Sequence, residues 1–152
     1  MTSLVFLQSV DILKGLSNDQ LNAIGKLCRE KSYMNEDVLF NEGQSAEHLF
    51  LISEGTVDLS FSLPGRILTP ETTIVSVSRG RAFGWSSLMP PYRYRLNAHC
   101  TSETCKVLHL NRAPLRRLFD EDMKLGFQVT VNLATLLSTR FRSLKNFREA
   151  TS

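Results

Sequence analysis

The residues best suited to chemistry lie close together in one segment, 81–95, with the sequence RAFGWSSLMPPYRYR. A strand that ends at Gly84 and continues into a short helical turn from Ser86 would point several backbone N–H groups in one direction, and such amides bind anions. Arg93 or Arg95, returning on the next strand, would add a guanidinium. The segment therefore predicts a site for an anion such as phosphate. The competing interpretation is a glycine turn followed by a solvent-exposed edge strand.

Other chemistries have little support in this sequence. The two serines after the glycine lack the Gly-x-Ser-x-Gly pattern of a serine hydrolase, and no P-loop is present. His99, Cys100 and Cys105 lie near one another, but no CxxC pair is present. His48 and His109 lack the spacing of metal ligands. We therefore expect a protein that is not an enzyme and that holds no metal or other cofactor.

Length and composition are those of one soluble domain spanning 1–152. Apolar residues make up 42% of the chain and charged residues 22%, and the net charge of +3 is too small to indicate nucleic-acid binding by itself. The three cysteines occur without a secretory signal or an apolar stretch long enough to span a membrane. We expect reduced thiols in a cytoplasmic protein that makes no membrane contact.

The segment 1–31 is predicted to be helical. Ser17 and Gln20 form a capping-box pattern at the start of a short helix. Apolar residues then recur at helical spacing and would form one buried face, namely Leu21, Ile24, Leu27 and Cys28.

The segment 33–110 is predicted to form short strands broken by turns that contain glycine. The alternation in 57–63 is that of a half-buried strand, and Glu54-Gly55 predicts a tight hairpin between it and the apolar run 48–53. The other expected strands are Val38–Phe40, Thr73–Val77, Arg95–Thr101 and Cys105–Leu110. Short strands at this spacing are typical of a small barrel or jelly roll.

The segment 112–147 is predicted to be helical, with one ambiguity. Residues 123–133 alternate as in a strand, but the acidic run 120–122 favours a helix N-terminus, and the later spacing is helical. As a helix, it carries two apolar stripes: one is Met123, Phe127, Val131, Ala134, Leu137, Phe141 and Leu144, and the other is Val129, Leu133, Leu136 and Phe147. Two stripes need two partners, so we expect one to pack on the barrel and the other to form a homodimer.

The same C-terminal segment is basic, because eight Lys and Arg residues stand against four Asp and Glu residues from residue 112 onward. A solvated helix face is the simpler explanation, and direct binding of nucleic acid is the competing one. We expect no DNA-binding domain after this helix, so a helix-turn-helix would have to lie on another chain.

The order of these motifs resembles that of cyclic-nucleotide-binding domains, the effector domains of catabolite-activator-type regulators, kinase regulatory subunits and gated channels. The resemblance rests on Phe40-Asn41-Glu42-Gly43, the run 48–55, Phe83-Gly84, Arg95 and the long C-terminal helix, and covers residues 6–147. It implies a mainly β fold, a β-jelly roll (double-stranded β-helix) with flanking helices and a C-terminal dimerisation helix.

The family's phosphate-binding cassette reads Phe-Gly-Glu, an aliphatic residue, Ala, and then an Arg that precedes a small residue. Its glutamate holds the ribose 2′-hydroxyl, while the arginine and backbone amides hold the cyclic phosphate. In this chain Gly84 matches the glycine, Leu88 matches the aliphatic residue, and Arg95 matches the arginine better than Arg93 does.

The cassette is degenerate at several positions. Trp85 stands in place of the glutamate, and an indole N–H cannot accept a hydrogen bond from a ribose hydroxyl. Ser87 replaces the usual alanine, Asn97 replaces the small residue, and the segment before the arginine is longer. The ligand-binding residues that we expect are Gly84, Trp85, Ser86, Ser87, Arg95 and Asn97.

The resemblance thus implies a regulatory module that binds cAMP, cGMP or another phosphorylated metabolite and signals through its C-terminal helix. The alternative is a scaffold for protein interactions whose vestigial pocket binds no cyclic nucleotide. The sequence names no protein partner.

Overall fold

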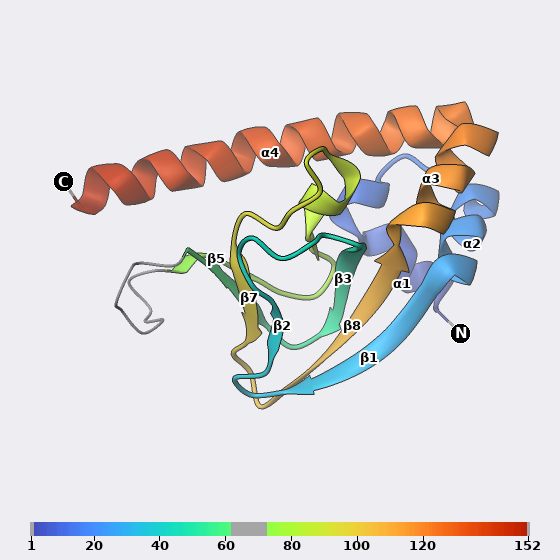
Figure 1. Cartoon of the computed structure of the whole chain (residues 1–152). Helices are drawn as coiled ribbons and strands as arrows, with labels where there is room; N and C mark the ends of the chain where they lie inside the picture. The colour runs from blue at the N-terminus through green and yellow to red at the C-terminus, as the bar shows by residue number, and fades with distance from the viewer. Residues whose placement is uncertain (1, 62–72, 152) are drawn as a thin grey trace.

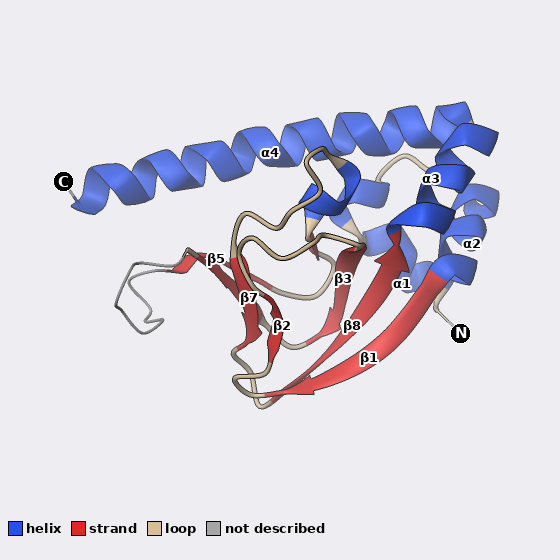
Figure 2. Ribbon diagram, in the orientation of Figure 1, coloured by secondary structure: helices blue, strands red, loops and turns tan. Residues whose placement is uncertain are grey.

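The computed structural model describes residues 2–61 and 73–151, with the side chains of 140 and 143–151 left out. Two four-stranded antiparallel sheets face each other as a jelly roll, and the helices gather at one end and along one side (Figures 1 and 2). The first sheet has the order β1 (Cys28–Met34), β8 (Thr104–Asn111), β3 (His48–Glu54) and β6 (Ala82–Phe83). The second has the order β2 (Val38–Phe40), β7 (Asn97–Cys100), β4 (Val57–Ser60) and β5 (Thr73–Val77). The predicted fold class is confirmed.

The helices begin where the sequence supplies caps. They are α1 (Leu4–Ser9), α2 (Asn18–Leu27), α3 (Arg112–Glu121) and α4 (Met123–Thr151), with the 3₁₀ turns η1 (Asp11–Leu13) and η3 (Trp85–Leu88). The predicted capping box opens α2, since the Gln20 amide donates to Ser17 Oγ (3.2 Å) and the Ser17 amide donates to Gln20 Oε1 (2.9 Å). The ambiguous segment 123–133 is helical, as the end signals predicted.

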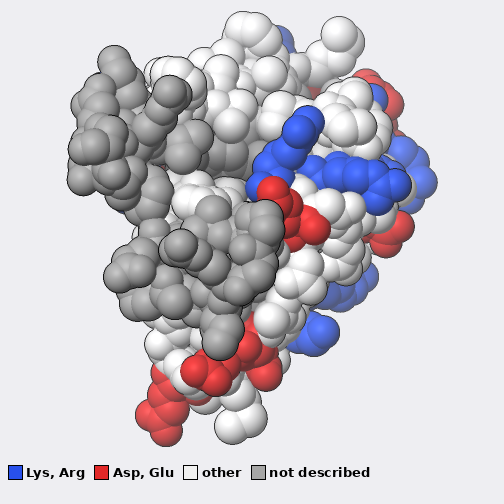
Figure 3. Space-filling model, turned by 60° about the vertical axis from the view of Figure 1, so that its left-hand side comes forward, with Lys and Arg blue, Asp and Glu red and all other residues white. Residues whose placement is uncertain are grey.

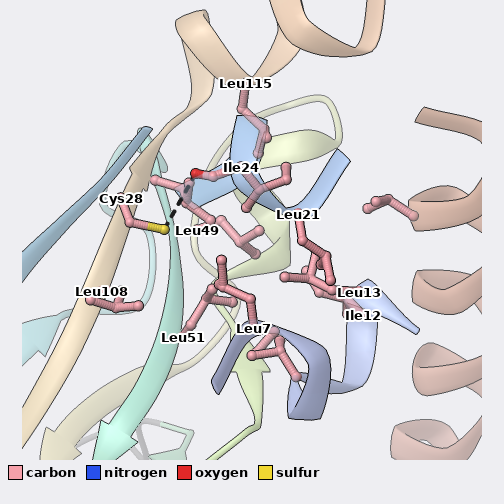
Figure 4. Packing of buried hydrophobic residues seen from close by; sticks show 14 of the residues in the cluster. Leu7, Ile12, Leu13, Leu21, Ile24, Cys28, Leu49, Leu51, Leu108 and Leu115 are labelled. Atoms are coloured by element: carbon pink, nitrogen blue, oxygen red, sulfur yellow. Dashed lines mark hydrogen bonds between the residues drawn. The ribbon is translucent and has the colours of Figure 1, made fainter. Parts of the chain in front are cut away.

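A first hydrophobic core fills the space between the helices and the outer face of the first sheet. Figure 4 shows its side chains converging from α2, η1, β3 and β8, with the Cys28 thiol donating to the Ile24 carbonyl (3.5 Å). Leu49, Leu51, Leu108 and Leu110 belong to this core, while the residues between them face the other way. Strands β3 and β8 are therefore buried on both faces, which explains the continuous apolar run 48–53.

A second core, largely aromatic, lies between the two sheets. Phe40 stacks on Tyr94 with 3.7 Å between ring centroids, and Phe50 stacks on Phe83 at 5.0 Å. Phe40 also contacts Phe50 at 5.4 Å, so the four rings form one connected cluster. This aromatic cluster fixes the distance between the sheets.

The long helix α4 has one buried and one exposed face, as the two predicted stripes require. Leu125, Val129 and Leu133 are buried in the first core, whereas Met123 is 79% exposed and Phe127 is 71% exposed. The helix runs along the end of the sheets in Figure 1. Its last predicted stripe residues, Leu144 and Phe147, lie outside the described side chains.

One polar residue of α4 fastens the helix to the N-terminal segment. The side-chain amide of Asn132 donates to the backbone carbonyls of Ile12 (2.8 Å) and Lys14 (2.9 Å). Both carbonyls lie at the end of η1, where the backbone has no helical partner for them. The contact therefore satisfies two acceptors with one side chain.

Two sequence predictions were wrong. The helical segment predicted to reach residue 31 ends at Leu27, because β1 begins at Cys28 and pairs with β8 from Cys28–Leu110 to Met34–Thr104. The backbone of this polar segment is thus satisfied by a partner distant in sequence, which local periodicity does not reveal.

The predicted hairpin at Glu54-Gly55 does not form. Strand β3 pairs with β6 and β8, while β4 pairs with β5 and β7, so the chain passes between sheets at Gly55. Gly55 has φ +87°, and a Cβ there would lie 2.5 Å from the Thr104 carbonyl oxygen. The glycine therefore permits a close crossing of β8, which is why it looked like a turn residue.

Two predicted strands are shorter than expected. The strand over 57–63 ends at Ser60, and residues 62–63 lie outside the described part of the chain. The strand predicted from Arg95 begins at Asn97, so Arg95 lies in the segment that enters β7.

Candidate functional site

A cavity of about 190 Å³ lies where the predicted anion site meets α4. We call it the Gly84 cavity. Its walls come from the second sheet, from the β6–η3 turn, from the segment before β7 and from α4: Phe40, Leu59, Phe83, Gly84, Trp85, Ser86, Met89, Tyr94, Arg95, Leu96 and Leu137. Four of the six predicted binding residues, Gly84, Trp85, Ser86 and Arg95, therefore line one cavity.

The turn that opens the cavity requires glycine. Strand β6 pairs with β3 through Phe83 and Phe50, and the chain then turns at Gly84 with φ +80°. A Cβ on Gly84 would lie 2.7 Å from Phe50 Cδ2 and 3.1 Å from the His48 carbonyl oxygen. Close packing and a left-handed backbone thus both exclude a side chain at this position. The first amides of η3, at Trp85 and Ser86, follow this turn directly.

Trp85 occupies the position at which the family's cassette has a glutamate. Its side chain is 8% exposed, lines the cavity and belongs to the first hydrophobic core. The indole supplies a large apolar wall but no hydrogen-bond acceptor. A ligand in this cavity meets an aromatic surface where relatives would offer a carboxylate.

The two candidate arginines have different surroundings. Arg95 is exposed and lines the cavity. Arg93 is exposed too, but it lies outside the wall of the cavity, and its Nη1 donates to the Gly43 carbonyl (3.1 Å). Of the arginines among the described residues, Arg95 is the one that faces the cavity.

Ser87 and Asn97 stabilise the surroundings of the cavity but lie outside its described wall, which corrects our expectation that they face the ligand. Ser87 is fully buried, and its amide (3.2 Å) and Oγ (2.8 Å) both donate to the Gly84 carbonyl. Asn97 is 4% exposed, and its Oδ1 accepts from the Glu42 amide (2.8 Å). Their polar atoms are used to hold the turn and the 41–43 loop in place.

Sequence reasoning missed several apolar wall residues. Tyr94 stacks on Phe40 and its hydroxyl donates to the His48 carbonyl (2.9 Å), and burial raises the pKa of Tyr94 to about 12. Leu137 reaches the cavity from α4, far along the chain. The helical stripe was recognised, but only the fold could show that one of its members meets the cavity.

A second, apolar crevice links η3 to the helices. Its volume is about 410 Å³, and it lies between Leu88 and Met89 on one side and Val129, Leu133 and Leu137 on the other. Met89 and Leu137 line both this crevice and the Gly84 cavity. The turn and α4 are thus packed against one another through two shared side chains.

The rest of the described surface offers no reactive centre. Burial raises the pKa of Cys28 to about 11 and that of Cys105 to about 12, so these thiols are poor nucleophiles near neutral pH. Across the described residues, no three His, Cys, Asp or Glu side chains are placed to hold a metal ion. On the face in Figure 3, acidic side chains lie among the basic ones. Of the described helices, none has the length and apolar character needed to cross a membrane.

Comparisons with known proteins agree with this geometry. Residues 30–122 match the model of the cyclic nucleotide-binding domain family. The chain is 29% identical over 123 residues to cGMP-dependent protein kinase, isozyme 1, of Drosophila melanogaster, a match covering 78% of this chain but only 15% of the kinase.

Two solved structures share the fold. A protein from Geobacter metallireducens GS-15, described as a cyclic nucleotide-binding protein, has 31% identity and a TM-score of 0.77 and covers 93% of this chain and 99% of its own. The regulatory domain of Toxoplasma gondii PKA, solved with cAMP, has 21% identity and a TM-score of 0.75 over 90% of this chain and 48% of its own.

Proposed function

Because the chain belongs to the cyclic nucleotide-binding domain family, we propose that it is a non-catalytic regulatory module that binds a small phosphate-bearing ligand in the Gly84 cavity. The ligand is a cyclic nucleotide or another phosphorylated metabolite, and occupancy is signalled through α4. Its expected location is the cytoplasm, which suits three free thiols.

One observation carries this proposal: the cavity wall contains both the anion-binding elements and a residue of the output helix. Arg95 supplies a guanidinium and the start of η3 supplies amides, while Leu137 belongs to α4. A ligand that fills the cavity must therefore contact, or displace, the helix. Differential contact of this kind is what a regulatory domain needs to shift an equilibrium.

The ligand chemistry follows from what the cavity offers. Arg95 and the η3 amides suit a phosphate group, and the aromatic wall suits an apolar or planar remainder. Without the glutamate, a buried ribose hydroxyl would lack its acceptor, which costs about 1–3 kcal/mol, or about ten- to a hundredfold in affinity. We therefore expect cAMP and cGMP to bind weakly and a smaller phosphorylated metabolite to bind better.

Output through α4 would act on a second copy of the chain. The outer stripe of the helix is exposed at Met123, Phe127, Val131 and Phe141 in the isolated chain. Apolar side chains at this spacing pack against an identical helix. A homodimer along α4, adjusted by the ligand through Leu137, is the form of signalling that we propose.

The test is a calorimetric titration with cAMP, cGMP and a panel of small phosphorylated metabolites, on the wild type and on Arg95→Glu. We expect the variant to lose binding of every ligand that the wild type binds. Arg93→Glu is the matched control, because it makes the same charge change two positions away, outside the described cavity wall. Both residues are exposed, so each change should alter the stability by only about 0.5 kcal/mol.

Each outcome bears on the proposal. Equal binding by wild type and Arg95→Glu would move the ligand away from the Gly84 cavity. Absence of both heat and a melting shift with all these compounds would refute sensing and leave the scaffold interpretation. Sedimentation of the wild type with and without ligand then measures whether occupancy changes self-association.

A further inference from the structure

A second hollow, of about 500 Å³, lies on the first sheet, where β1 begins after α2 and β8 ends before α3. We call it the histidine groove. Its polar wall residues are Arg29, Glu30, Lys31, His48, His109 and Asn111, and its volume is within the range of ligand sites, about 300–1,000 Å³. It shares no wall residue with the Gly84 cavity.

Strand register brings the basic groups of this groove together. Arg29 on β1 and Phe50 on β3 each pair directly with His109 on β8, and His48 pairs with Asn111. Side chains that pair across strands stand about 5 Å apart on one face. The ring centroids of His48 and His109 are 5.5 Å apart, with an edge-to-face arrangement. Residues distant in sequence thus form one cluster.

The cluster is held in place by its own contacts. Arg29 Nη1 donates to the carbonyls of Lys26 (3.1 Å) and Cys28 (3.0 Å), which turns the side chain towards the end of α2. The Tyr33 hydroxyl and His109 Nε2 are 2.9 Å apart, and Lys31 Nζ lies 5.2 Å from the Tyr33 ring centroid. Arg29, Lys31 and His109 also form part of the groove wall.

The cationic side chains have no acidic counterpart close by. Among the described residues, no carboxylate lies within 4.0 Å of a side-chain nitrogen of Arg29, Lys31, His48 or His109. Glu30 is the one acidic residue of the described wall. The titratable and charged groups around His109 are thus Arg29, Lys31 and Tyr33 on β1 and His48 on β3. Glu30, also on β1, adds one carboxylate to the groove wall.

The pKa of His109 is changed by burial and by the surrounding positive charge. Burial, together with the nearby His48 and Lys31, lowers the pKa of His109 to about 4, so its imidazole is neutral at pH 7. A negative charge in the groove would offset the repulsion from His48 and Lys31 and would favour the imidazolium. By linkage, an anion whose own charge stays constant must bind more tightly as the pH falls towards the pKa of His109.

We propose that the histidine groove is a second anion site, which binds a phosphate group between Arg29, Lys31 and the two histidines. Arg29 and Lys31 supply permanent charge, and protonation of His109 adds a donor at lower pH. The site is independent of the Gly84 cavity and of the proposed regulatory function.

The experiment follows the histidine Cε1–H signals by NMR in a pH titration, with inorganic phosphate and with chloride at matched ionic strength. The chain has three histidines, and His99 on β7 in the other sheet is an internal control. We expect phosphate to raise the half-titration pH of His109 by about one pH unit, to change the His48 signal, and to leave the His99 signal as it is in chloride. Equal titration curves in phosphate and chloride would overturn the proposal without requiring any variant.

A variant pair tests the assigned residues. Arg29→Gln combined with Lys31→Gln should weaken phosphate binding at the histidines about tenfold. Lys106→Gln is the control, because Lys106 is also exposed on this sheet but lies outside the described groove wall. Unchanged phosphate affinity in the double variant would contradict the assignment.

Arg95→Glu separates this site from the Gly84 cavity. The histidine response to phosphate should persist in that variant, even though binding in the Gly84 cavity is expected to be lost. Loss of the histidine response in Arg95→Glu would mean that the two sites are one. Failure of either proposal can therefore be recognised separately.

Discussion

The Gly84 cavity and the histidine groove meet the same aromatic cluster but are built from different kinds of backbone. Phe50 lies between them. Its ring centroid is 5.0 Å from that of Phe83 in the cavity wall and 4.7 Å from that of His109 in the groove wall. A left-handed glycine turn and a helix contribute to the cavity wall, whereas regular paired strands form most of the groove. The cavity can therefore change shape when α4 moves, while the groove offers fixed positions to a ligand.

The largest expected effect comes from the glycine at the turn that opens the Gly84 cavity. Gly84→Ala places a Cβ 2.7 Å from Phe50 Cδ2 in a left-handed conformation, so we expect the free energy of unfolding to fall by about 2–4 kcal/mol. Gly43→Ala is the control: φ is +88° there, but no heavy atom lies within 4 Å, so the cost should be about 1 kcal/mol. Urea unfolding measures both. Equal losses would show that the contact with Phe50 is unimportant.

A second prediction alters the cavity alone. Trp85→Glu restores the acceptor found in the family's cassette and should raise cyclic-nucleotide affinity about ten- to a hundredfold. Trp85→Ala opens the same space without an acceptor and serves as the control. Calorimetry with cAMP and cGMP checks the result, and a gain in Trp85→Ala as large as that in Trp85→Glu would assign the effect to bulk alone. The histidine titration in the groove should not change in either variant.

A third prediction concerns the groove alone and follows from the sign of the His109 shift. Since its pKa is lowered from 6.5 to about 4 by folding, the unfolded chain takes up a proton between these pH values that the folded chain does not. This contribution to stability is complete above pH 6.5 and is lost as the pH falls towards 4. Melting curves across this range should therefore show declining stability, with a shallower decline in His109→Gln. Identical slopes for the two proteins would be evidence against a buried neutral imidazole.

The smallest effect is expected at the contact between the cavity and α4. Leu137→Ala removes part of an exposed apolar wall, so affinity for a cyclic nucleotide should fall by about threefold. Phe141→Ala is the control, since this residue is 69% exposed on the same stripe and lies outside the described cavity wall. If both variants bind alike, Leu137 does not contact the bound ligand.

Much of the fold could be predicted because the relevant signals are local. The capping box of Ser17 and Gln20 predicts the start of α2. The acidic run before Met123 favours α4, and the alternation from Val57 predicts β4. Strand β1 could not be predicted, since its polar sequence becomes a strand through pairing with β8. Gly55 gave a turn signal for a different reason, because β8 passes close to it.

The two sites differ in the same respect. Gly84, Trp85, Ser86 and Arg95 are close in sequence, so a short motif was enough to group them in the Gly84 cavity. The groove has no such motif, because its basic residues come from three strands that meet only through register. Its histidines lacked the spacing of ligands and were therefore not grouped as a site by sequence reasoning.

The hydrogen bonds of Asn132 fasten the first part of α4 to the N-terminal segment. The part before Asn132 contains the buried Leu125 and Val129, and the two carbonyls of the N-terminal segment hold the helix at this point. Leu137, which touches the Gly84 cavity, lies one turn beyond it. If a ligand displaced α4 at Leu137, as the proposed function requires, the shift would grow with distance along the rest of the helix, because the contacts of Val129, Asn132 and Leu133 hold its first part in place.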